Sequence, residues 1–422
     1  MKIPIFKKIY GALFYSLKIR LLMFLAVFGP ATITAMADND AAGVATFSLV
    51  GAKFGYSILF VLFFVTILLA LTQEMGIRMG IVTGKGLGDL IRERYGIKIS
   101  IFTFAALFIA NIGTTIANFS ALKVTASMFH IPVIPMILGI ILISFLFISK
   151  GNYKTNQYIF LISSIFYFFY ILSAVKSNPD WGLAVKSIFI PTDIKLSKEF
   201  IFASIAVIGT TVTPWGQFFI QSYINDKKIS PDKLKFSQIE TYFGAFLTNI
   251  FAFFIILATA ATLYIRKIQL VSGEQAALAI APFAGEMASL LFGVGLLNAG
   301  FMGIVIVSLS TAYAFSEFFG VEGSLNSPFH KGKSFYVLFL LQLVIAAAVV
   351  LLPTISLFKI VLFTQSLNAI LLPIVFYFLL KLINNKDLMG RYVNSTWYNC
   401  FAIISSILII AASAFTFISY FI

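Results

Sequence analysis

The 422-residue sequence contains one cysteine, Cys400, and two histidines, His130 and His330. A single cysteine excludes an internal disulfide and any multi-cysteine metal centre. Both histidines lie at the edges of predicted loops, so neither is placed for a buried proton relay. The sequence also has no nucleophile–base pair or His/Cys metal centre of the kind that catalysis needs. We therefore expect that the protein is not an enzyme and that it carries no cofactor.

Charge is scarce as well. Charged residues make up 11% of the chain and hydrophobic residues 60%, whereas a soluble domain has about 25% charged residues. With many long apolar runs, this composition predicts an all-α polytopic membrane protein. Residues 1–20 are basic and amphipathic and lack a small-residue cleavage site, so we predict a cytoplasmic interfacial segment there. Residues 21–422 would then form a single transmembrane domain.

The apolar runs give a predicted topology. If the N terminus is cytoplasmic, 21 of the 30 lysines and arginines fall in cytoplasmic segments and nine in outer loops. This bias predicts a multi-pass protein of the cell membrane with its N terminus inside and its C terminus outside. The net charge of +14 then mostly reflects the lysines and arginines of the cytoplasmic segments, and we expect no nucleic-acid partner. The predicted spans are roughly 21–52, 54–77, 99–122, 131–149, 155–175, 199–224, 237–265, 284–316, 335–357, 360–380 and 393–421.

Two of these segments contain interruptions. The first has 32 residues and would run about 48 Å as one helix, against a hydrocarbon core of about 30 Å. It contains Gly29-Pro30 and the stretch DNDAAG, residues 38–43, while the sixth contains GTTVTPWG, residues 209–216. Breaks in helices one and six, unwound near mid-membrane, are typical of a five-plus-five inverted repeat with a midplane site. We predict repeats at about 21–175 and about 199–380, with an eleventh helix at about 393–421.

The two carboxylates in the first break, Asp38 and Asp40, are expensive to place inside a membrane. Unwound backbone carbonyls and an acid in such a break can hold a cation. The same acids could instead cap a half-helix or lie in a polar pocket. The match with the break in the sixth segment favours a cation site more for Asp40 than for Asp38.

The stretches DAAGVAT…GAKFGY, between residues 40 and 56, and GIRMGIVTGKGLGDLIRERYG, residues 76–96, resemble the Nramp family of divalent-metal transporters. The resemblance covers at least spans one to ten and implies a LeuT-type fold. Aligning on Phe54-Gly55-Tyr56 without gaps puts Asp40 on the aspartate of the family's DPGN motif. The resemblance thus implies that Asp40 binds the metal.

Other motif positions differ from the family. The ligand asparagine becomes Gly43, the metal-binding methionine becomes Thr213, and the histidine of the MPH motif becomes Trp215. The acids of the third span become Thr115 and Asn118. By the resemblance, with Asp38 and Gln217 added from their positions beside the breaks, the predicted metal site comprises Asp38, Asp40, Gly43, Thr210, Thr213, Gln217 and Gln365.

The departures bear on the substrate. A thioether favours softer transition metals, and a larger site lined by oxygen suits a partly hydrated Mg²⁺. The pattern resembles a divergent, Nramp-related branch of magnesium transporters, so we expect uptake of Mg²⁺, with Mn²⁺ accepted by the same site and no proton coupling. The alternatives are proton-coupled uptake of Mn²⁺ or Fe²⁺ and, less favoured, sodium-coupled symport of an organic solute. The expected partners are the metal ion and the lipid bilayer, without an obligate protein partner.

Several polar residues near the breaks have a structural interpretation. We expect the polar residues of the third span, Asn111, Thr114, Thr115 and Asn118, to form hydrogen bonds between helices. Gln217 could face the cation or pack within the bundle. Trp215 and Met36 are expected to pack.

Overall fold

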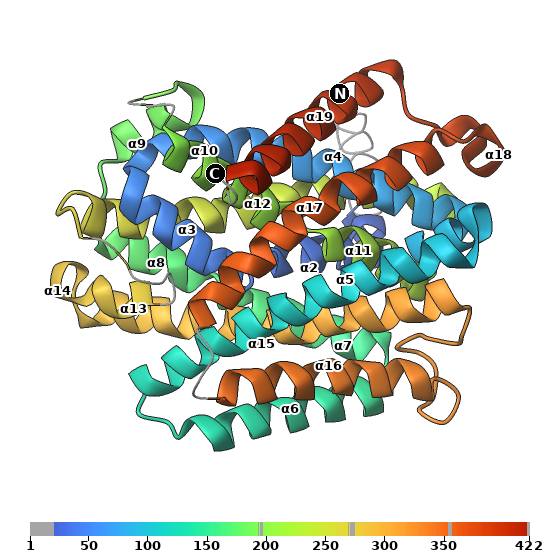
Figure 1. Ribbon diagram of the computed structural model, residues 1–422, viewed down its shortest axis with the longest axis horizontal. Coiled ribbons are helices and arrows are strands. Elements are labelled where there is room, and N and C mark those ends of the chain that lie inside the picture. Colours follow the sequence, from blue (N-terminus) through green and yellow to red (C-terminus); the bar gives the residue numbers. More distant parts are fainter. Residues whose placement is uncertain are drawn as a thin grey trace, which may run out of the picture.

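The computed structural model describes residues 21–192, 194, 197–268, 270, 275–352 and 357–419. The predicted amphipathic segment 1–20 lies outside this part. Throughout the described ranges the secondary structure is helical (Figure 1). The long helices are α4 (Leu59–Thr83), α5 (Leu87–Met128), α6 (Val133–Lys150), α12 (Leu234–Thr259), α15 (Glu286–Phe319), α16 (Lys333–Leu351), α17 (Leu357–Ile383) and α19 (Thr396–Ser419).

Shorter helices complete the bundle. The first predicted segment forms α2 (Pro30–Ala37) and α3 (Ala41–Phe54), and the sixth forms α10 (Lys198–Thr211) and α11 (Pro214–Lys227). The fifth is divided into α7 (Tyr153–Ile165) and α8 (Phe168–Lys176), where we expected one helix. The connecting elements are η1 (Gly55–Ile58), α9 (Trp181–Phe189), η2 (Pro231–Lys233), η3 (Ala260–Tyr264), α13 (Ala276–Ala279), α14 (Ala281–Ala284), α18 (Lys386–Met389) and η5 (Gly390–Tyr392).

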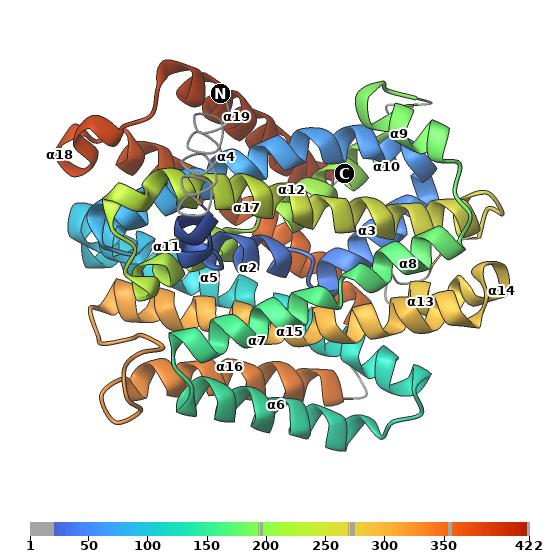
Figure 2. The same cartoon turned by 180° about the vertical axis from the view of Figure 1, so that it is seen from behind.

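The connections gather at two opposite ends of the molecule. The helices α9, α13 and α14 lie at one end, while α18 and the loop between α15 and α16 lie at the other (Figures 1 and 2). The predicted topology requires this separation of alternate loops. Among the described residues, seven helical stretches are long and apolar enough to cross a membrane. These two observations fit a polytopic membrane protein.

The two broken helices have local causes. Gly29 adopts φ of +138°, which glycine tolerates best, and Pro30 then starts α2. Asp40 ends the first break as the N-cap of α3, and Thr213 ends the second as the N-cap of α11, with Pro214 at the first helical position. The breaks are narrower than expected. Only residues 38–40 and 212–213 leave the helices, because Asp40 and Thr213 each cap the following helix at once.

Close helix approach organises the centre of the bundle. α15 packs along α5, and glycines make room at this contact. A Cβ on Gly303 would lie 2.4 Å from Asn118 Oδ1, and one on Gly300 would lie 2.9 Å from Leu122. Small residues serve this purpose in membrane helix pairs. The contact fixes the position of Asn118 beside the first break.

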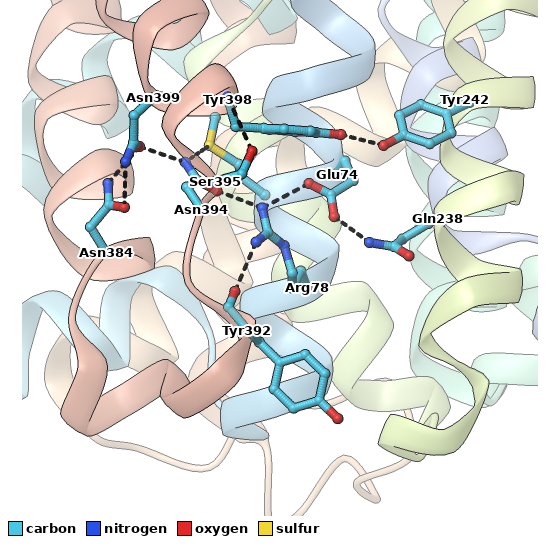
Figure 3. Close-up of polar contacts among 11 residues, drawn as sticks. Glu74, Arg78, Gln238, Tyr242, Asn384, Tyr392, Asn394, Ser395, Tyr398 and Asn399 are labelled. Carbon is cyan, nitrogen blue, oxygen red and sulfur yellow. Dashed lines mark hydrogen bonds and ion pairs between the residues drawn. The ribbon is translucent and has the colours of Figure 1, made fainter.

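A buried polar cluster connects α4 to the segment that leads into the last helix, α19. Arg78 forms an ion pair with Glu74 at 2.9 Å, and it also donates to the Tyr392 carbonyl and to Asn394 Oδ1 (Figure 3). Glu74 in turn accepts from Gln238 on α12 at 2.7 Å. We predicted that the second span ends at residue 77. α4 continues to Thr83, and Arg78 is buried against its partners.

Candidate functional site

Asp38 lies in the first break and faces the second. Thr213 Oγ1 donates to Asp38 Oδ1 at 3.0 Å, and Gln73 Nε2 donates to Asp38 Oδ2 at 3.2 Å. The side chain of Asp38 is 3% exposed. Asp38 is therefore buried against α11 and α4, and it is as little exposed as Asp40.

Asp40 has a different set of partners. Its Oδ1 accepts from the Gly43 backbone N–H at 2.8 Å, which caps α3, and its Oδ2 accepts from Asn118 Nδ2 at 2.8 Å. Asn118 Oδ1 accepts from the Ala41 N–H at 2.9 Å. Asp40 therefore caps a helix and is a buried carboxylate, which is the structural role that was weighed against a cation site. Each oxygen keeps a lone pair that a cation could use.

Gly43 and Thr210 bring the two breaks together. A Cβ on Gly43 would lie 2.6 Å from the Asp38 carbonyl oxygen and 3.4 Å from Thr210 Oγ1. An asparagine side chain does not fit at position 43 in this backbone. Pro214 has no N–H, so the Thr210 carbonyl lacks its donor four residues later. Gly43 can contribute only backbone, and Thr210 offers a hydroxyl and a free carbonyl.

Gln217 leaves one of its polar atoms without a partner. Its Nε2 contacts Thr72 Oγ1 at 3.4 Å, while Gln217 Oε1 and Gln73 Oε1 are buried and have no hydrogen-bond partner among the described residues. An amide oxygen in this state is free to accept from water or to coordinate a cation. Sequence reasoning missed Gln73. The signal was the polar run Thr72-Gln73-Glu74 inside a predominantly apolar span.

The polar residues of the third predicted span hydrogen-bond between helices, as predicted. Asn118 contacts the first break, and Asn111 Nδ2 donates to Thr311 Oγ1 on α15 at 2.8 Å. Thr115 accepts from Gln342 on α16 at 2.8 Å, and Thr114 accepts from Asn368 on α17 at 3.2 Å. These contacts fix α5 beside the site with neutral groups.

The remaining predicted residues are placed as follows. Trp215 and Met36 are buried, as expected, with Trp215 1% exposed. Gln365 belongs to α17, but its side chain lies outside the described residues.

The assembled site is made of hard oxygen donors. Two carboxylates, Asp38 and Asp40, lie in one three-residue break, and the Thr213 hydroxyl and the Gln73 amide both hydrogen-bond to Asp38. Two buried like charges destabilise a site unless a cation or protons compensate them. Within the described part of the chain, no group of three His, Cys, Asp or Glu side chains could hold a metal. The oxygen donors present are of the kind that Mg²⁺, Ca²⁺ and Mn²⁺ accept.

Comparison with known proteins gives a family match. The sequence profile described as "Natural resistance-associated macrophage protein-like" (Nramp) matches residues 31–419. A "Divalent metal cation transporter MntH" from Nostoc sp. is 24% identical over 405 residues, covering 92% of this chain and 90% of that protein. The protein of the same name from Staphylococcus aureus is 26% identical over 421 residues, covering 92% and 89%.

Solved structures show the same fold. A mutant of the Eremococcus coleocola manganese transporter superposes with a TM-score of 0.76 at 19% identity, covering 93% of this chain and 86% of that one. A Na⁺-coupled sialic acid symporter superposes with a TM-score of 0.62 at 14% identity, covering 96% of each chain. These similarities concern the fold alone. They confirm the predicted all-α architecture of the LeuT type.

Proposed function

The chain belongs to the Nramp family, and from that premise we propose that it transports divalent metal cations across the membrane. The observation that carries the proposal is the pair of buried carboxylates in the break between α2 and α3, held against the break between α10 and α11. Unwound segments of this kind supply ion sites near the membrane midplane. The names of the relatives, which are divalent metal cation and manganese transporters, support the same class of substrate.

At the level of the individual ion, the relatives support Mn²⁺ better than Mg²⁺. Mn²⁺ accepts carboxylate, carbonyl and water ligands, so the oxygen donors of this site suit it. Uptake of Mn²⁺ is therefore the leading proposal.

Mg²⁺ is a second candidate because Thr213 supplies a hydroxyl and Gly43 no side chain, which leaves a donor set without sulfur beside Asp38. Mg²⁺ retains several waters when it binds protein. Competition of Mg²⁺ against Mn²⁺ uptake in proteoliposomes distinguishes the two. Strong competition at equal concentrations supports Mg²⁺ as a substrate. Absence of competition excludes Mg²⁺ as a substrate.

The central test removes the carboxylates. We expect Asp40→Ala to abolish Mn²⁺ uptake into proteoliposomes, because Asp40 occupies the position that the family motif assigns to the metal. Asp38→Ala should also reduce uptake strongly, since Thr213 and Gln73 both point their donors at it. Asp232→Ala, which changes an exposed acid in η2, is the matched control and should transport normally. Near-normal uptake by a correctly folded Asp40→Ala protein would contradict the site.

A further inference from the structure

α7 begins and α11 ends at the same end of the molecule (Figure 2). Residues from both helices line a basic pocket there. Its volume is about 400 Å³. It is separate from the two helix breaks, and the transport proposal does not use it. The lining includes four lysines, namely Lys154, Lys227, Lys228 and Lys233.

The charges of the pocket are predominantly positive. Burial lowers the pKa of Lys227 to about 8, against the opposing effect of Glu240, so Lys227 still carries its charge at neutral pH. Asp226 is the one acid of the lining. Its Oδ2 already accepts from the Tyr313 hydroxyl at 2.5 Å and from the Leu325 N–H at 2.8 Å. The lysines therefore dominate the field in the pocket.

Two neighbouring features favour an anionic ligand further. Lys154 is in the first turn of the 13-residue helix α7, where the helix dipole favours negative charge. Tyr153 also lines the pocket, is 4% exposed, and has a hydroxyl without a hydrogen-bond partner among the described residues. A phosphate oxygen is a suitable acceptor for such a hydroxyl.

The rim of the pocket is apolar and points to a lipid. Leu25 lines the pocket and is 55% exposed, and Leu21 and Leu22 on the same helical segment are each 56% exposed. Phe243 on α12 is 45% exposed and pairs with Phe28 at a ring distance of 6.2 Å. A free phosphate would use the lysines but not this apolar surface.

Residues 1–20 are not a suitable occupant. They contain five lysines and arginines and no acid, so the lysines of the pocket would repel them. Under the predicted topology, the pocket faces the cytoplasmic leaflet, where anionic lipids attract basic groups near the surface.

We propose that this pocket binds the phosphate headgroup of an anionic phospholipid, whose acyl chains lie along the exposed apolar surface of Leu25 and Phe243. Because the pocket also contains Val27, the lipid contacts the chain just before α2. Lys227 Nζ already donates to the Val27 carbonyl at 2.7 Å and to the Phe28 carbonyl at 2.5 Å. The bound lipid would thus add to the contacts that hold the start of the first broken helix against α11.

The test measures lipid binding to the full-length protein by native mass spectrometry, without reference to transport. Phosphatidylglycerol and phosphatidylcholine with identical acyl chains are the probes. The pocket variant is Lys154→Gln/Lys228→Gln/Lys233→Gln, which leaves Lys227 and its carbonyl contacts intact. The control is Lys235→Gln/Lys331→Gln/Lys333→Gln, which removes the same charge from exposed positions in the predicted cytoplasmic segments.

We expect wild type and the control to prefer phosphatidylglycerol, and the pocket variant to bind it at least roughly tenfold more weakly. Equal weakening in both triple variants, or no preference in wild type, would overturn the proposal. Displacement of the lipid by inorganic phosphate at equal concentration would assign the pocket to a soluble anion instead. If the triple variant misfolds, Lys154→Gln should still weaken binding and Lys154→Arg should restore it.

Discussion

The Thr213 hydroxyl makes two hydrogen bonds in the site. It accepts from the Gly216 N–H, which caps α11, and it donates to Asp38 Oδ1. Replacing Thr213 with methionine removes both hydrogen bonds and adds a soft thioether, which favours softer metals. We expect Thr213→Met to strengthen Cd²⁺ or Mn²⁺ binding and to weaken any transport of Mg²⁺. Titration calorimetry and competitive uptake measure the change. Thr213→Ser is the control, and an unchanged ratio of Mg²⁺ to Mn²⁺ uptake in Thr213→Met would remove position 213 from the site.

Gly43 stands where even one methyl group does not fit. A Cβ there would approach the Asp38 carbonyl oxygen to 2.6 Å, and backbone cannot move aside as a flexible side chain does. We therefore expect Gly43→Ala to widen the break, lower thermal stability and sharply reduce metal uptake. Gly139→Ala is the matched control, because its Cβ would meet nothing within 4 Å in α6. Normal uptake by Gly43→Ala would show that the break adapts easily.

For individual residues, the sequence predicted the site where a polar or charged residue interrupts an apolar segment. Two acids in an apolar run predicted a polar site, and the structure places Asp38, Asp40, Gly43, Thr210 and Thr213 around the two breaks. Neither the orientation of Asp38 toward Thr213 nor the role of Gln73 could be predicted, because both depend on how α4 and α11 pack. A buried glutamine in an apolar helix is compatible with many partners.

Among the helices, α4 depends on an ion pair that lies inside the protein. The side chains of Arg78 and Glu74 are 9% and 1% exposed. Arg78→Gln leaves Glu74 as an uncompensated buried charge, which typically destabilises by about 3–5 kcal/mol. We expect a clearly lower unfolding temperature in detergent for Arg78→Gln. The double variant Glu74→Gln/Arg78→Gln should regain most of the lost unfolding temperature. If it does not, the contacts of Arg78 with Tyr392 and Asn394 contribute more to stability than the pairing of charges does.

The breaks in the helices were predictable from glycine, proline and polar residues, but their extent was not. DNDAAG suggested six unwound residues, whereas Asp40 caps α3 so directly that Ala41–Gly43 are already helical. Similarly, α7 and α8 are separate helices within an uninterrupted apolar run. Hydrophobicity predicts that a segment is buried in a bilayer or core, while the end of each helix depends on individual capping contacts.

Among the described residues, the side chains that donate hydrogen bonds to Asp38 and Asp40 are neutral, namely Thr213, Gln73 and Asn118. By the motif alignment, we expect Thr115, Asn118 and Trp215 to stand at the positions of the family's titratable groups. Gln342 donates to Thr115, while Asn118 bonds to Asp40 and to the Ala41 N–H. We expect metal uptake without coupled proton transport. Flux should follow the metal gradient and the membrane potential, which favours inward movement of a divalent cation by about 4.6 kcal/mol at −100 mV.

A pH-sensitive dye inside proteoliposomes checks this expectation. Adding Mn²⁺ outside should raise internal Mn²⁺ without acidifying the lumen, and an imposed pH gradient should not drive accumulation. Ionophore-treated and protein-free liposomes are the controls. Acidification that needs both Mn²⁺ and Asp40 would establish proton coupling and support the alternative mechanism.

The hydrogen bonds of Arg78 on α4 with the segment before α19 also have a consequence for the order in which the protein is completed during synthesis. Arg78 and Asn394 are 316 positions apart in the chain. At a synthesis rate of about 5–20 residues per second, Arg78 leaves the ribosome roughly 16–60 s before Asn394 exists. Until then, Arg78 lacks the two acceptors that Tyr392 and Asn394 provide. Its hydrogen bonding is therefore complete only once the chain has been made almost to its end.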